Sequence, residues 1–158
     1  MSSMYFLVTI ADRALLTDFV NAYKEEGVLV NFISLGHGTA SNELRSKLGL
    51  ESSEKAIFFS CVSQENWNKL KKNLEHNIRI DIPGTGIAFT VPMSSVGGKR
   101  ELAFLTDGQK ITREKESAMT GTTREALIVI SNQGYNDTVM RAARAGGAPH
   151  GRAGQDGV

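Results

Sequence analysis

Two short glycine-containing segments are the parts of this sequence best suited to hold a charged ligand. They are Gly84-Thr85-Gly86 and Gly36-His37-Gly38-Thr39. Glycines leave backbone N–H groups exposed, and successive N–H groups can wrap an anion such as a phosphate. Thr39 adds a hydroxyl that can contact a base or a phosphate. The alternative for the first segment is a plain turn into a strand, and for the second a flexible exit from a strand.

A polar stretch of about a dozen residues follows the second of these segments and ends at Ser53. Connections of this length are usually functional or disordered, which favours a loop that docks on a partner protein. The residues that we expect to make such contacts are Asn42, Leu44, Arg45 and Leu48. Leu44 and Leu48 would share one face of a short amphipathic helix. The alternative is a surface connection that covers the edge of a sheet.

Several other chemistries are disfavoured by composition. The chain of 158 residues has a formal net charge of +1, which argues against direct nucleic-acid binding or strong attraction to anionic lipid. Three histidines share no ligand spacing, and the single cysteine, Cys61, allows neither a disulfide nor a zinc site of Cys pairs. No apolar run approaches the roughly 20 residues of a membrane-spanning helix, and the start lacks a basic leader segment. We therefore expect a cytoplasmic protein without a metal site or membrane insertion.

The elements that must position these segments follow from the apolar pattern. Strands are predicted at 4–10, 28–35, 55–62 and 87–91, the first of them buried on both faces. Asp12 and Ser63 can each cap a helix, and Gly27 ends the first helix. The order β-α-β-β-α-β predicts an α+β fold of the ferredoxin-like kind.

The opening of the chain recurs 120 residues later. Leu7, Ile10, Ala22 and Gly27 match identical residues at 127, 130, 142 and 147. This register predicts a second strand at 124–130 and a second helix at 135–146, a partial βα copy of the first module. We therefore divide the chain into a module at 1–96, a linker at 97–123 and an incomplete second half at 124–158.

The segment 125–148 resembles the PII family of nitrogen-regulatory proteins, most closely members with two tandem halves. Gly134, Val139-Met140, Ala142-Ala143-Arg144 and the final glycine-alanine carry this resemblance. It implies a homotrimer that signals rather than catalyses, with no required cofactor and with an adenine nucleotide such as ATP or ADP as effector between subunits. It also implies a mobile loop between the second and third strands, and a phosphate-binding loop where Gly84-Thr85-Gly86 stands.

The sequence departs from that family at two places. Related tandem proteins continue after the glycine-alanine with a complete second half, whereas here Pro149-His150-Gly151-Arg152 follows, as a truncated or frame-shifted product or as a native short form. No tyrosine lies between Gly36 and Ser53, so uridylylation of a loop tyrosine is not expected.

Two other functions remain open from the sequence. One is a small acylphosphatase-like hydrolase, which would need an arginine and a backbone cradle after the first strand, where Ala11-Asp12-Arg13 stands without glycines. The other is a structural or metal-responsive trimer that binds no nucleotide.

Overall fold

The computed structural model describes residues 4–38, 54–111 and 126–148. The chain divides into two compact units, Met1–Ala118 and Met119–Val158. The first unit contains β1 (Met4–Asp12), a short 3-10 turn η1 (Arg13–Leu15), α1 (Leu16–Glu25), β2 (Phe32–His37), β3 (Glu54–Ser63), α3 (Gln64–Asn73), a π-helical turn η2 (Leu74–Ile78), β4 (Gly86–Pro92) and α4 (Lys99–Leu105). The second unit contains α5 (Asn136–Ala145).

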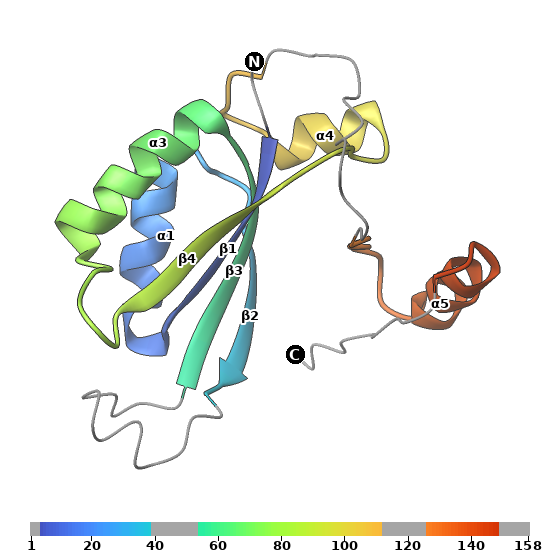
Figure 1. The fold of residues 1–158 in the computed structure, drawn as a ribbon, viewed down its shortest axis with the longest axis horizontal. Helices are drawn as coiled ribbons and strands as arrows, with labels where there is room; N and C mark the ends of the chain where they lie inside the picture. The colour runs from blue at the N-terminus through green and yellow to red at the C-terminus, as the bar shows by residue number, and fades with distance from the viewer. Residues whose placement is uncertain (1–3, 39–53, 112–125, 149–158) are drawn as a thin grey trace. The chain divides into compact units, whose positions relative to one another are not determined.

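The four strands form one antiparallel sheet in the order β2-β3-β1-β4. Figure 1 shows α1 and α3 side by side, each crossing between two strands of this sheet. This arrangement confirms the predicted ferredoxin-like βαββαβ fold and the position of β1 at the centre of the sheet.

The core lies between the sheet and the two helices, and aromatic side chains fill its middle. Phe19 and Tyr23 of α1 each pack against Phe58 of β3, with ring centroids 5.8 and 5.5 Å apart. All three are fully buried, together with Leu7 of β1 and Leu70 of α3. The buried residues of each helix recur at helical spacing, so each helix turns one apolar face toward the sheet.

The other face of the sheet carries the alternate residues of each strand. Phe6 stacks on Phe59 there at 5.9 Å, and Phe89 lies opposite Val8 across the β1–β4 pair. These side chains are partly exposed, and Phe89 keeps 45% of its surface. The expectation that the first strand is buried on both faces is therefore met on only one face in the single chain.

Strand β2 begins four residues later than predicted. Val28 is drawn into the core by the end of α1, and Asn31 donates to its carbonyl oxygen at 3.1 Å while accepting from the Ser60 hydroxyl. These side-chain bonds take the place of strand pairing over 28–31, so pairing starts at Phe32 and ends at His37. Gly36 and His37 thus lie inside the strand and not after it.

The segment predicted as a linker at 97–123 begins with an ordered part. Helix α4 occupies its first residues, and Gln109 beyond it accepts from the Ser63 N–H and donates to the Cys61 carbonyl, both at 2.8 Å. The Gln109 amide therefore pairs with the edge of β3 as a neighbouring strand would, beyond the point where β2 begins.

The repeat with an offset of 120 is reproduced in the helices. Helix α5 has the bounds of α1 shifted by 120, and both helices end alike. At the end of α1, the N–H groups of Val28 and Gly27 donate to the carbonyls of Tyr23 and Lys24. At the end of α5, the N–H groups of Ala148 and Gly147 donate to the carbonyls of Ala143 and Arg144 in the same pattern. Both glycines have positive φ, which fits the usual glycine-terminated end of a helix.

The predicted strand at 124–130 is wrong over its described part. Residues 126–132 form no strand, and Leu127 exposes 81% of its surface. A strand needs a hydrogen-bonded neighbour, and the described residues of this unit offer none.

A buried hydroxyl pair in the core gives a first test of stability. Thr9 Oγ1 and Tyr23 Oη lie 2.5 Å apart, and both side chains are fully buried. We expect Tyr23→Phe to lower the free energy of unfolding by about 1–2 kcal/mol, because the Thr9 hydroxyl loses its partner. Urea unfolding of Tyr23→Phe, Thr9→Val and the double variant measures this, and an additive double variant would contradict the pairing.

The same pair predicts a loss of stability at alkaline pH. Burial raises the pKa of Tyr23, and the Thr9 hydrogen bond opposes this only in part. The unfolded tyrosine ionises near pH 10, so above that pH the folded state holds a proton that the unfolded state has lost. The stabilisation is full below pH 10 and falls as the pH rises toward the folded pKa, and Tyr23→Phe should remove this part of the decline.

Candidate functional site

The two glycine segments singled out in the sequence lie at the same end of the sheet. Gly36 in β2 pairs with Lys55 of β3, and Gly86 at the start of β4 pairs with Ala11 of β1. Gly38 directly follows β2. Thr39 and the predicted loop contacts lie outside the described residues; those contacts are Asn42, Leu44, Arg45 and Leu48.

The two segments occupy opposite edges of that sheet end. Strands β3 and β1 stand between β2 and β4. With neighbouring strands about 4.8 Å apart, three steps separate Gly36 from Gly86 by roughly 14 Å. One chain therefore does not bring the two candidate segments together.

Thr85, in the middle of the Gly84-Thr85-Gly86 turn, uses both of its backbone polar groups within the chain. Thr85 donates its N–H to the Ile82 carbonyl at 3.2 Å, and its carbonyl accepts from the Asp12 N–H at 3.2 Å. Gly84 has φ +96°, which an L side chain rarely adopts. The turn is thus closed on itself, and the N–H of Thr85 is not available to an anion in this conformation.

Gly86 is required by close packing. A Cβ built on it would lie 2.9 Å from the Ile10 carbonyl oxygen and 3.3 Å from both Ala11 Cα and the Phe19 ring. The glycine lets β4 approach β1 over the end of α1. Gly36 differs, because the same test finds only the Ile57 side-chain tip at 3.4 Å, an ordinary contact.

Two ion pairs join the middle strands at this end of the sheet, and sequence reasoning missed both. Lys55 Nζ lies 3.2 Å from Asp12 Oδ2, with both side chains about 80% buried, and Arg13 Nη1 lies 3.1 Å from Glu54 Oε2 at half exposure. Asp12 also accepts from the Ala14 N–H, which confirms its predicted cap, here of η1. Only the strand register brings these charges together, so no local spacing could have found them.

Cys61 is buried in β3, and His76 is exposed on η2. Cys61 is 4% exposed, and burial raises the pKa of its thiol, which disfavours the thiolate needed by a nucleophile. His76 is exposed on η2 with Nδ1 2.7 Å from the Lys72 carbonyl. Within the described ranges, no three residues of the types His, Cys, Asp and Glu are grouped as a metal site.

The helices of the described ranges include none that is long and apolar enough to cross a bilayer.

No family model matches this chain, and no curated protein matches it either. Solved structures do. A PII-like signalling protein of Thermus thermophilus is 22% identical, with a TM-score of 0.45 over 61% of this chain and 94% of its own. GlnK of B. subtilis in complex with ATP is 18% identical, with a TM-score of 0.43 over 58% and 83%. PII of Arabidopsis thaliana bound to citrate is 16% identical, with a TM-score of 0.47 over 73% and 97%. The solved structures that the chain is similar to are thus PII proteins.

Proposed function

We propose that this chain is a PII-like signal-transduction regulator that assembles as a homotrimer, binds an adenine nucleotide between subunits and controls a partner protein through residues 39–53. The proposal goes beyond the fold in three respects: the oligomer, the ligand and the loop. Each is supported by a different feature of the described residues or of the sequence.

The observation that carries the proposal is the placement of the two glycine segments on opposite edges of one sheet end. About 14 Å separates them in a single chain. When copies of the chain meet edge to edge, Gly36 and Gly38 of one subunit come near Gly84, Thr85 and Gly86 of the next. A nucleotide held by both segments therefore fits between subunits. Arg13 and Lys55 supply positive charge at this sheet end, and phosphates would compete with Glu54 and Asp12 for them.

The open face of the sheet supports the oligomer. Ile87, Phe89 and Val91 of β4 each keep 45–64% of their surface exposed, on a face continued by Val8 and by the stacked pair Phe6–Phe59. Contiguous apolar surface of this kind usually marks an interaction site. Covering it with further copies of the same chain also shields the exposed edge strands.

The hydrolase alternative is disfavoured by the residues after β1. An acyl phosphate would need free backbone N–H groups there. Instead the Asp12 N–H donates to the Thr85 carbonyl, and the Ala14 N–H donates to the Asp12 carboxylate. No observation favours a metal-responsive trimer over a nucleotide-binding one.

The test is thermal unfolding of the full chain with ATP, ADP or GTP, combined with the native mass. A ligand that binds only the folded state at 100 times its dissociation constant stabilises it by about 2.7 kcal/mol. For a domain of this size we expect ATP or ADP to raise the Tm by several degrees. A flat response to both adenine nucleotides would reject the ligand assignment.

Matched arginine variants locate the site. Arg13→Gln removes a charge at the proposed site, whereas Arg100→Gln removes one on α4, which follows the opposite end of β4. We expect the first to weaken nucleotide binding about tenfold, since charge-assisted bonds to phosphate are worth roughly 1.5–3 kcal/mol, and the second to leave it unchanged.

A further inference from the structure

The second unit presents a run of apolar residues that has no strand partner within the single chain. Leu127, Ile128, Val129 and Ile130 keep 81, 57, 50 and 57% of their surface exposed. Residues 126–148, the described part of this unit, contain no strand. The segment 126–131 has no charge, proline or glycine, and short segments of this composition readily pair with copies of themselves.

The rest of the sequence of this unit offers no suitable partner strand. Residues 119–125 read Met-Thr-Gly-Thr-Thr-Arg-Glu, and residues 149–158 include one proline and three glycines. Both compositions disfavour a strand. A second copy of the same unit does supply an apolar segment that lacks a strand neighbour.

The first unit shows how two strand–helix units bury such a surface together. Strand β1 with α1 is one such unit, and β3 with α3 is the other. The two strands pair antiparallel with Val8 opposite Phe59, and the two helices lie side by side on one face. At the offset of 120, Ile128 takes the place of Val8, and α5 takes the place of α1. The second unit is thus one half of this arrangement.

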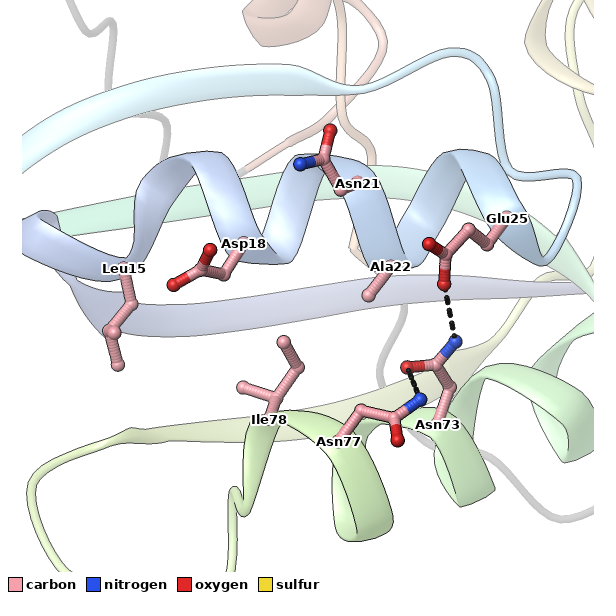
Figure 2. Close-up of a pocket in the computed structure, with 8 residues that line it drawn as sticks. All are labelled: Leu15, Asp18, Asn21, Ala22, Glu25, Asn73, Asn77 and Ile78. Carbon is pink, nitrogen blue, oxygen red and sulfur yellow. Dashed lines mark hydrogen bonds between the residues drawn. The ribbon is translucent and has the colours of Figure 1, made fainter.

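The helix of the second unit has a side that suits a close helical neighbour. Figure 2 shows the side of α1 that faces the end of α3 and η2, with Ala22 and two carboxylates on it. The positions of α5 that correspond to these three residues hold Thr138, Ala142 and Ala145. All three are small, uncharged and exposed in the single chain. A second helix can therefore approach α5 closely on this side.

We propose that two copies of the chain associate through their second units, with residues 126–130 paired as antiparallel strands about a twofold axis at Ile128. This register places Leu127 opposite Val129 of the second copy and Ile128 opposite itself, so each cross-strand pair is apolar. The axis runs perpendicular to the strands, so both α5 helices lie on the same face, as α1 and α3 do. Such a contact is closed by its symmetry, whereas a parallel pairing would continue into a fibre.

The inference concerns the second unit alone and does not rest on the proposed nucleotide site or trimer. If the first units form a trimer, twofold pairs of second units join two trimers into a hexamer of D3 symmetry, a common arrangement. Two strands and two helices form a small interface. We therefore expect a dissociation constant on the order of 10 μM.

Thiol crosslinking of the full chain tests the register. In the proposed pair, the two copies of residue 128 have Cβ atoms about 5 Å apart, whereas the two copies of residue 131 are about 20 Å apart. At a protein concentration above the dissociation constant, a short bismaleimide should give at least about tenfold more covalent dimer with Ile128→Cys than with Ser131→Cys. The native Cys61 is 4% exposed, and the unsubstituted chain measures its background. Equal crosslinking at both positions, as parallel pairing would give, or none at residue 128 would overturn the proposal.

Sedimentation velocity over a range of concentrations tests the association itself. Ile128→Lys places like charges opposite each other in the strand pair and should halve the limiting mass. Gln133→Lys adds the same charge at an exposed position outside the pairing segment and should leave the mass unchanged. An unchanged mass in Ile128→Lys, an equal loss in both variants, or growth of the unsubstituted chain into fibres would overturn the twofold pair. Ile128→Lys should keep any rise of Tm with nucleotide, so this proposal and the nucleotide site fail independently.

Discussion

Gly86→Ala is expected to lower the free energy of unfolding by about 2–3 kcal/mol, in the upper range for overpacking a close contact. The added Cβ would meet the Ile10 carbonyl oxygen at 2.9 Å, and that atom belongs to the central strand, which cannot move aside cheaply. Relief requires β4 to shift away from β1, which would strain the pairing of Gly86 with Ala11. Urea unfolding monitored by circular dichroism measures the loss.

Gly36→Ala is the matched comparison, because it changes the other glycine of the candidate site without a steric conflict. Its Cβ would meet only the tip of Ile57 at 3.4 Å, and its φ is not in the left-handed region. We expect its stability to change by less than about 0.5 kcal/mol. If the two variants were equally stable, the structural account of Gly86 would be wrong.

The contrast also separates two reasons for a glycine at this sheet end. A nucleotide effect in Gly36→Ala would report on the approach of a ligand to the backbone, since the fold is unchanged. The same effect in Gly86→Ala would be uninformative, because the strand that carries the site is itself displaced. The sequence alone could not separate these cases, since both glycines stand beside a strand in a short polar segment.

The spacing of apolar residues and the helix-capping residues predicted the helices and strands of the first unit, because both agree with the fold that forms. Ser63 is an example: its hydroxyl accepts from the Asn66 N–H and begins α3 as predicted. Asn66 then donates to the Glu26 carbonyl at 2.6 Å and ties this cap to the end of α1. Such consistency between local and tertiary interactions makes the pattern readable from the sequence.

The features that escaped prediction depend on contacts between distant residues. The pairing of Gln109 with the edge of β3 joins residues 46 and 48 positions apart, and the Arg13–Glu54 pair joins residues 41 positions apart.

In the second copy of the repeat, the predicted helix forms but the predicted strand does not. A helix satisfies its own backbone hydrogen bonds, so α5 forms in the predicted register with the same glycine-terminated end as α1. A strand depends on neighbours, so Leu127 to Ile130 remain unpaired and exposed although their residue types match those of β1. Two segments of similar residue types can therefore share a strand propensity, while only the one with hydrogen-bonded neighbours forms a strand.

Phe89→Lys is expected to dissociate the proposed oligomer while the single chain remains folded. Phe89 keeps 45% of its surface exposed in the isolated chain, so the substitution should cost the monomer little. In an assembly that covers this face, a lysine would bury its charge without a partner. We expect the dissociation constant of the oligomer to rise at least about 100-fold, equivalent to ~2.7 kcal/mol. Sedimentation velocity and native mass spectrometry measure the change.

The control is Leu29→Lys, in the segment between α1 and β2, which has a similar exposure of 47% and lies at the other end of the sheet from the glycine segments. It should leave the oligomer intact, and dissociation by both variants would point to a general effect of charge.

The Phe89 variant also tests how assembly and effector binding depend on each other. If the nucleotide sits between subunits, Phe89→Lys should abolish its binding although Gly36, Gly86 and Arg13 are untouched. Full nucleotide affinity in a monomeric Phe89→Lys protein would place the ligand within one chain and reject the intersubunit site.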